Sequence, residues 1–181
     1  MTRFKNFLKD EGGSAIIEYL FVFPMIFFIF TASIESSVYM IKYVMFERSV
    51  DITVRGLRLG KYGEISHQNL KKEICANGVL GRDPAKCMQV MRIWMQPINT
   101  GNFAMGSTTP ACVDRATDVN TGAPLSSDYS LGSDNEIMLV RVCMKEWPMF
   151  PTIMGFSVKM PVQTDGSVVM IASTTFVNEP G

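Results

Sequence analysis

The feature that most constrains this chain is an apolar stretch close to its N-terminus. It runs from Ser14 to Ile34 with the sequence SAIIEYLFVFPMIFFIFTASI, and residues 19–34 carry no charge. A helix rises about 1.5 Å per residue and a bilayer core is about 30 Å thick, so a helix of about 20 residues can cross it. The stretch therefore predicts one transmembrane helix over residues 14–35.

The charges before this stretch predict its orientation. Arg3, Lys5 and Lys9 precede it, and positive residues at one end of a membrane helix favour the cytoplasmic side. The N-terminus is then cytoplasmic and the rest of the chain lies on the far side of the membrane. The whole chain has 17 basic and 17 acidic residues. It lacks a global basic field, so we expect no nucleic-acid partner.

Two residues are unusual inside the apolar stretch. Glu18 is a carboxylate that costs a few kcal/mol at a bilayer centre, although it can snorkel to the interface. Pro24 removes one backbone donor and kinks a helix. Each has an ordinary explanation, but the spacing of Gly13, Ser14, Glu18 and Tyr19 is more specific. A polar leader ends in glycine, a small residue follows, and a glutamate stands fifth after the glycine.

This spacing resembles the processing site of type IV pilins and pseudopilins, and Glu followed by Tyr is the form of the Flp/Tad branch. The longer resemblance is to the TadE-like minor pilins of the Tad pilus apparatus. It rests on an opening motif made by Phe7, Asp10, Gly13, Ser14, Ala15, Glu18 and Pro24. It also rests on later segments, namely Val140-Arg141-Val142-Cys143, Trp147-Pro148 and Asn178-Glu179-Pro180. A TadF-like protein shares the opening motif and stays an alternative.

The resemblance implies how the N-terminal segment is used. A prepilin peptidase would cut after Gly13, remove residues 1–13 as a cytoplasmic leader, and make Ser14 the mature N-terminus. Glu18 would pair with the new amino group or with a neighbouring subunit, and Glu18, Tyr19 and Pro24 would serve assembly.

The resemblance also implies partners and a location. The partners would be a major Flp-type pilin, other minor pilins and the inner-membrane assembly platform. The protein would help to initiate, cap or scaffold a Tad pilus used in adhesion and surface attachment. It would cross the bacterial inner membrane once, with its C-terminal domain in the periplasm and the extracellular pilus as a second location.

Helical spacing of apolar residues continues the N-terminal helix over residues 36–60, with Gly56 and Gly60 as end signals. Ser66 can cap a short helix over residues 67–76, and Asp83-Pro84 can open another turn. The remainder, residues 61–181, is expected to form one extracytoplasmic domain.

Three segments of that domain have strand character: residues 88–96, 137–147 and 167–177. Residues 99–135 are rich in Gly, Ser, Thr, Asn, Asp and Pro and predict a long loop. The expected fold class is α+β, with a long helix laid against a small antiparallel sheet.

The four cysteines all follow the apolar stretch. They are Cys75, Cys87, Cys112 and Cys143, and an even number outside the cytoplasm suggests two disulfides. Of the three possible pairings we favour Cys75–Cys87 with Cys112–Cys143, because each closes a local loop. The chain has no C-x-x-C and one histidine, so no metal site is expected.

No enzyme is expected. His67 is the single histidine, and its lysine-rich surroundings suggest a surface position. A serine or cysteine nucleophile therefore has little choice of base. There is no phosphate-binding or dinucleotide-binding glycine motif, so we expect neither a cofactor nor catalytic residues.

Two other functions compete with the pilin hypothesis. In the first, residues 21–30 form the core of a conventional signal peptide that is cleaved at Thr31-Ala32-Ser33, releasing a disulfide-bonded binding domain. In the second, the chain is an uncleaved single-pass membrane scaffold. Neither explains Glu18 inside the apolar stretch.

Overall fold

The computed structural model describes residues 14–78, 83–102, 112, 129–149, 163 and 165–179. The predicted leader, residues 1–13, and most of the predicted loop 99–135 lie outside these residues. Within them the chain divides into two compact units. One contains the first part of the N-terminal helix, as far as Val38, together with Met149. The other contains Tyr39–Pro148 and the described residues from Gln163 onward.

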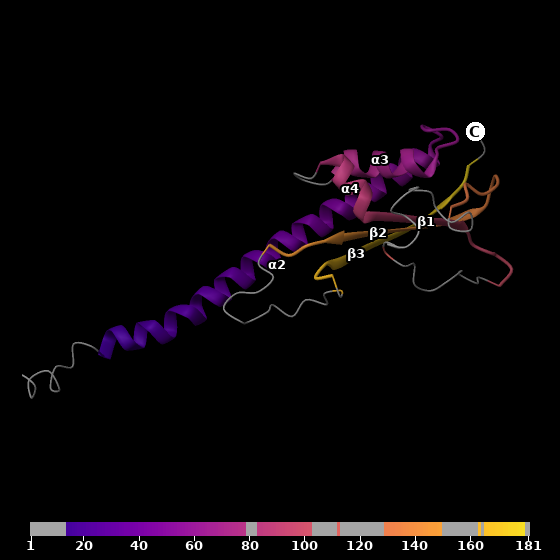
Figure 1. The fold of residues 1–181 in the computed structure, drawn as a ribbon. Coiled ribbons are helices and arrows are strands. Elements are labelled where there is room, and N and C mark those ends of the chain that lie inside the picture. Colours follow the sequence, from indigo (N-terminus) through magenta and orange to yellow (C-terminus); the bar gives the residue numbers. More distant parts are fainter. Residues whose placement is uncertain are drawn as a thin grey trace, which may run out of the picture. The chain divides into compact units, whose positions relative to one another are not determined.

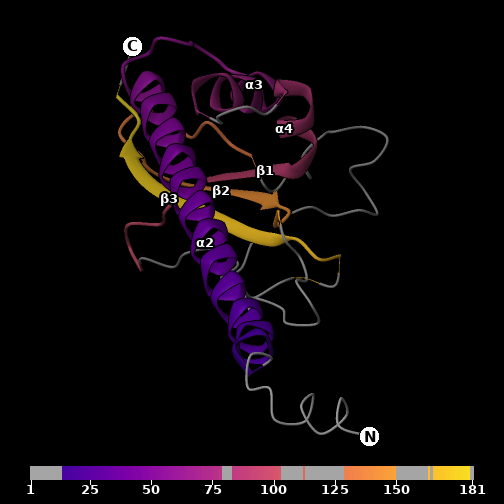
Figure 2. The same ribbon diagram turned by 90° about the vertical axis from the view of Figure 1, so that its left-hand side faces the viewer.

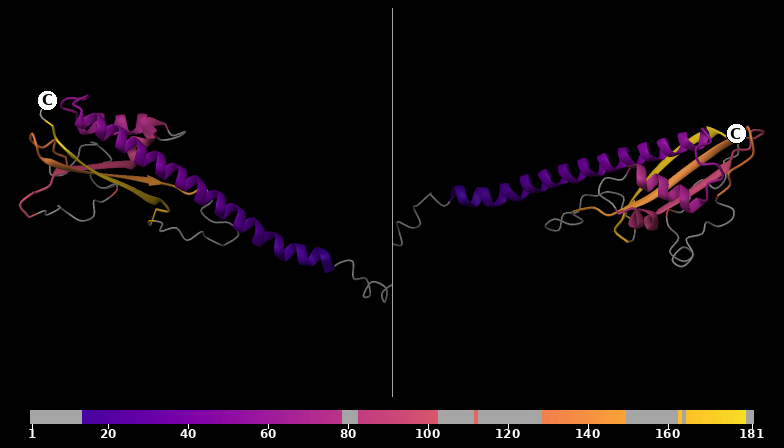
Figure 3. Two further views of the ribbon diagram at one scale, coloured as in Figure 1. Left: turned by 180° about the vertical axis from the view of Figure 1, so that it is seen from behind. Right: turned by 90° about the horizontal axis from the view of Figure 1, so that it is seen from above.

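The N-terminal helix, α2, is a single helix of 45 residues over Ser14–Arg58. Pro24 lies inside it, and Figure 3 draws α2 as one continuous helical ribbon. It ends at Arg58, two residues before the predicted end at residue 60, and Gly60 adopts a left-handed φ of 64°. The amide of Lys61 donates to the carbonyl of Gly56 (3.0 Å), and that of Gly60 donates to Leu57 (3.0 Å). This pattern is a Schellman motif, which satisfies the free carbonyls of the last turn.

Two short helices follow. α3 spans His67–Gly78, and the Ser66 hydroxyl accepts a hydrogen bond from the Asn69 amide (3.3 Å). α4 spans Pro84–Val90 with Asp83 as its N-cap, whose carboxylate accepts from the Ala85 amide (3.0 Å). Side-chain caps of this kind satisfy backbone donors that a helix start leaves free.

The sheet has three antiparallel strands in the order β1-β2-β3 (Figure 1). They span Met91–Pro97, Ile137–Glu146 and Val168–Val177. In the register, Val142 of β2 stands opposite Ile93 of β1 and Ala172 of β3. Successive side chains of a strand point to opposite faces, so these three lie on the same face of the sheet.

That face forms the core, with the C-terminal part of α2 and with α3 packed over it (Figure 2). The helices contribute Phe46, Val50, Val54, Leu70 and Ile74, all buried. The strands contribute buried methionines at 91, 95, 138, 144 and 170 among their β-branched residues. Methionine is flexible enough to fill the irregular space between a helix and a twisted sheet. The observed class is thus mixed helix and strand, with helices on one face of an antiparallel sheet.

Two features differ from the expectations. The first strand begins at Met91 instead of residue 88, because α4 continues to Val90 from its Asp83 cap. His67 is buried, with 6% of its surface exposed, and its ring contacts Tyr129 edge to face. The surface position predicted for His67 is therefore wrong.

Tyr129 also alters the picture of the predicted loop 99–135. It forms a parallel bridge with Met95, and its hydroxyl donates to the carbonyl of Ile65 (2.8 Å). Burial raises the pKa of Tyr129 to about 12. The C-terminal end of the segment is therefore packed onto the domain.

Replacing Phe46 by alanine should lower the free energy of unfolding by about 3–5 kcal/mol, because its ring is fully buried and leaves a cavity. Ile52→Ala is the matched control on the same helix, since Ile52 is 44% exposed and should cost far less. Chemical denaturation of the detergent-solubilised chain measures both. Equal losses would mean that Phe46 does not anchor the helix to the sheet.

Candidate functional site

The first half of α2 presents apolar side chains on every side. Among the described residues from Ile16 to Phe30, most large apolar side chains are exposed, such as Phe21 (74%) and Met25 (70%). In its candidate membrane-spanning window only 6% is buried. A helix that is apolar all round is normally buried in a protein core or in a membrane. α2 is therefore long and apolar enough to cross a membrane by length and composition, and its first half is largely uncovered by the described residues of the chain.

The predicted assembly residues lie in this exposed part of the helix. Glu18 is exposed, and among the described residues it forms no ion pair. Tyr19 is 62% exposed and begins a ladder of stacked rings, with centroids 5.3 Å apart to Phe23 and a further 6.0 Å to Phe27. Pro24 is half-buried within the same turns. The three residues share one short stretch of helix.

The predicted processing residues lie at the edge of the described chain. Ser14 is the first residue of α2, so Glu18 follows it by one helical turn. Gly13 lies outside the described residues. The proposed cut would consequently fall immediately before the helix.

A second acid, Glu35, occupies a different environment. It is 5% exposed, and its carboxylate accepts a hydrogen bond from the backbone amide of Met149 (2.9 Å). Both residues belong to the same compact unit. The sequence around Glu35 gives no signal for this bond, because the partner is a backbone amide 114 residues further along the chain.

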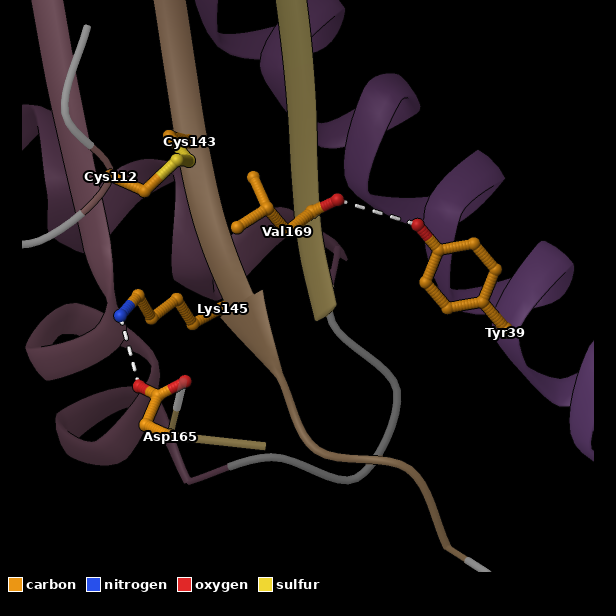
Figure 4. Close-up of a disulfide and its surroundings, with 6 residues drawn as sticks. All are labelled: Tyr39, Cys112, Cys143, Lys145, Asp165 and Val169. Carbon is orange, nitrogen blue, oxygen red and sulfur yellow. Dashed lines mark hydrogen bonds and ion pairs between the residues drawn. A yellow bond between two sulfur atoms is a disulfide. The ribbon is translucent and has the colours of Figure 1, made fainter. Parts of the chain in front are cut away.

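The domain part of α2 contacts the outer edge of the sheet through tyrosines. Tyr39 donates to the carbonyl of Val169 (3.5 Å), and Tyr43 donates to that of Ile171 (3.1 Å). Figure 4 shows Tyr39 reaching from α2 towards β3. Burial raises the pKa of both phenols. Since β3 is the edge strand of the three described strands, the two hydroxyls donate to backbone carbonyls on the side of β3 that no described strand pairs with.

An ion pair joins α2 to the end of β2. Nζ of Lys42 lies 2.6 Å from Oε1 of Glu146, and the two side chains are 28% and 10% exposed. This low exposure reduces solvent screening, so the pair holds more firmly than an average surface pair.

A polar cluster pins the start of β3. Asp165 accepts hydrogen bonds from the hydroxyl (2.6 Å) and the amide (3.1 Å) of Ser167, and Nζ of Lys145 lies 3.0 Å from it (Figure 4). These donors favour the charged form, the Ser167 hydroxyl most strongly, and hold the pKa of Asp165 well below its usual range. Gly166 follows in a left-handed conformation with φ of 77°, which a turn at this position requires.

The four cysteines form two disulfides, and the pairing is the one favoured from the sequence. Cys75–Cys87 joins α3 to α4 inside the core, and Cys112–Cys143 joins a residue of the loop segment to β2 (Figure 4). Disulfides of this kind persist in oxidising compartments. They are consistent with an exported domain.

The C-terminal Asn-Glu pair has a structural role. The side-chain amide of Asn178 donates to the carbonyls of Leu131 (3.3 Å) and Ser133 (3.2 Å). Glu179 pairs with Arg58 at the end of α2 (3.2 Å). The end of β3 is thus tied both to the turn before β2 and to the helix. Pro180 lies outside the described residues.

Across the described part of the chain, no group of three or more His, Cys, Asp or Glu side chains could hold a metal ion. His67 is buried against Tyr129.

Comparison with protein-family models, with curated proteins and with solved structures finds no match for this chain.

Asp165→Asn should lower the melting temperature at pH 7 and should reduce the acid sensitivity of the fold. The folded pKa of Asp165 lies below the ordinary value of 3.8. Its stabilising effect is therefore present above that value and is lost as the pH falls further. As the pH falls below about 4, the melting curves of the wild type and the variant should approach each other progressively, because the charged form is lost only as the pH nears the lowered pKa of Asp165.

Asp134→Asn serves as the matched control, because Asp134 is exposed. If Asp165→Asn and Asp134→Asn change the melting temperature equally at every pH, the Asp165 cluster does not stabilise the start of β3.

Proposed function

We propose that this chain is a membrane-anchored subunit of prepilin type, a TadE-like minor pilin that takes part in assembly of a Tad pilus. Its role is structural and not catalytic. In this proposal a prepilin peptidase removes residues 1–13, α2 crosses the bacterial inner membrane once, and the disulfide-bonded domain lies in the periplasm. The partners are a major Flp-type pilin, other minor pilins and the inner-membrane assembly platform.

The observation that carries the proposal is the position and state of Glu18. It stands fifth after Gly13 in an apolar helix, it is exposed, and it forms no ion pair within the described residues. A carboxylate left unpaired in an apolar medium is costly. A partner from outside the chain, or the amino group that cleavage would create at Ser14, would remove this cost.

The continuity of α2 adds support. The exposed apolar turns and the buried residues Phe46 and Val50 belong to one helix. A conventional signal peptidase would have to cut at residues 31–33. There the hydroxyls of Thr31 and Ser33 bond to carbonyls of the preceding turn at 2.9 and 2.8 Å. A regular helix is a poor substrate for cleavage, so the anchored form is favoured over the released domain.

Expression with the matching peptidase and secretion genes should give a mature chain that starts at Ser14 and stays in the membrane fraction. Intact mass and N-terminal sequencing measure this directly. Replacing Gly13 should leave the chain full-length, because the peptidase of this class requires the glycine.

Two other results would each replace the proposal. A chain that starts near Ile34 and is released from the membrane would support a secreted domain with a conventional signal peptide. An intact Met1 terminus, in cells where the peptidase processes its other substrates, would support a plain membrane anchor.

Glu18→Ala should leave cleavage largely intact and impair incorporation of the protein into pili, because the pairing charge is lost. Co-purification with the major pilin from sheared filaments measures the incorporation. Asp51→Ala is the matched control, an exposed acid of the same helix. Normal incorporation of the Glu18→Ala protein would show that Glu18 has no part in assembly.

A further inference from the structure

The backbone groups of β3 alternate between the side that faces β2 and the outer edge of the sheet (Figure 1). Tyr43 donates to the carbonyl of Ile171 on the outer edge (3.1 Å). The amide of Asn178 instead donates to the carbonyl of Glu136, which leads into β2 (2.9 Å). The odd-numbered residues of β3 therefore direct their N–H and C=O groups outward, and the outward positions after Ile171 are 173, 175 and 177.

These three positions carry backbone groups without a partner. Within the described part of the chain, no hydrogen bond reaches the outward N–H or C=O groups of Ser173, Thr175 or Val177. Their side chains are exposed and lie on the face of the sheet opposite the core. Each residue offers one donor and one acceptor, at the spacing that a neighbouring extended chain would need.

The sequence of β3 lacks the features that normally protect an edge strand. Val168–Val177 reads VVMIASTTFV, with no charge, no proline and no glycine. Charged residues, proline and bulges usually keep such an edge from pairing with another chain. Tyr39 and Tyr43 occupy carbonyls in the first half of the strand only. The second half is therefore a template for strand addition.

Contacts at both ends limit the length of this open edge. Tyr43 occupies the edge at Ile171, and Glu179 is held by Arg58 of α2 at 3.2 Å. Residues 173–177 lie between these contacts and extend over about 16 Å. This length suits a short extended segment of a partner.

A second copy of β3 fits this edge poorly. Antiparallel pairing centred on Thr175 would place Glu179 of one copy opposite Ile171 of the other, where Tyr43 already occupies the edge. Pairing centred on Ser173 would bring Thr175 of one copy against the same tyrosine. A segment that ends before Ile171 avoids this conflict, so the edge favours a short segment from a different chain.

We propose that residues 173–177 of β3 bind an extended segment of a different protein chain, which adds to the sheet as a strand beside β3. Its backbone exchanges hydrogen bonds with the outward groups of the edge. Its side chains on the outer face lie beside Ile171 and Val177, which are 40% and 44% exposed, so uncharged β-branched or apolar residues suit these positions. This binding belongs to the sheet domain and does not require the proposed cleavage after Gly13.

Amide hydrogen exchange, measured by NMR on the full chain in detergent, tests whether the edge is open. In the chain alone, the outward amides of residues 173, 175 and 177 should exchange fast. The amides of Ala172, Thr174 and Phe176 should exchange slowly, because they bond to β2. If the outward amides are equally slow at every protein concentration, the edge is already occupied and the proposal is wrong.

A defined peptide tests the docking itself. The probe is a short acetylated and amidated peptide of alternating valine and threonine with a lysine at each end. At about ten times its dissociation constant, it should slow exchange of the outward amides about tenfold, because only the free fraction exchanges. The same peptide with an N-methylated backbone should have no effect, since it cannot donate to a strand.

Edge variants show where the peptide binds. Thr175→Pro removes one outward N–H and leaves the bonds to β2 intact, so it should raise the Kd of the peptide about tenfold. Thr175→Ala keeps both backbone groups and is the matched control, with a Kd within about twofold of the wild type. Slow exchange of Ala172 verifies that the proline variant is folded. Val177→Pro repeats the test at the next outward position if it is not.

Three results would overturn the proposal. No protection by the probe would mean that the edge does not accept an extended peptide. Equal binding to the wild type, Thr175→Pro and Val177→Pro would place the peptide elsewhere on the chain. Outward amides that become protected as the concentration of the chain alone rises, and that lose this protection in Thr175→Pro, would make a second copy the occupant.

Discussion

The packing of the C-terminal part of α2 against the sheet is the interaction on which the rest of the structure depends. A sheet of three strands is stable in water only when its apolar face is covered. Phe46, Val50 and Val54 provide that cover together with α3. The covering helix is the same one that begins with exposed apolar turns. One continuous helix thus has two apolar parts: the domain covers the C-terminal part, and the described residues leave the first part largely exposed.

The polar contacts around this core orient the strands and do not replace the packing. Tyr39 and Tyr43 occupy carbonyls at the outer edge of β3, which protects an edge that could otherwise pair with another chain. Asn178 and Asp165 hold the two ends of β3 through bonds to nearby turns. Together these contacts fix the register of β3 under the helix. The side chains on the core face alone would not fix this register at the exposed end of the strand.

Much of this fold follows from local patterns. The apolar length, the Gly60 end signal and the Ser66 and Asp83 caps place three helices, and alternating Val, Ile and Thr place β2 and β3 within a residue or two. The predicted start of β1 was wrong because residues 88–90 fit both a strand and a helix pattern. The Asp83 N-cap stabilises the helix that includes these residues. The burial of His67 could not be read locally, since it depends on Tyr129, a residue from the far end of a long polar segment.

The two acids of the apolar helix show where sequence reasoning on the site succeeds and where it stops. Glu18 and Glu35 bracket the apolar stretch, about 26 Å apart along a helix, and the sequence offers the same residue type at both places. Only Glu18 stands at a distinctive spacing from a glycine, so only it could be singled out.

The structure then separates Glu18 and Glu35 by their partners. Glu35 is buried and bonds to a backbone amide of its own chain, whereas Glu18 is exposed with no ion pair among the described residues. Because an apolar environment penalises an unpaired carboxylate, the acid satisfied within the chain is a structural residue. The other is the acid for which the described residues supply no ion pair.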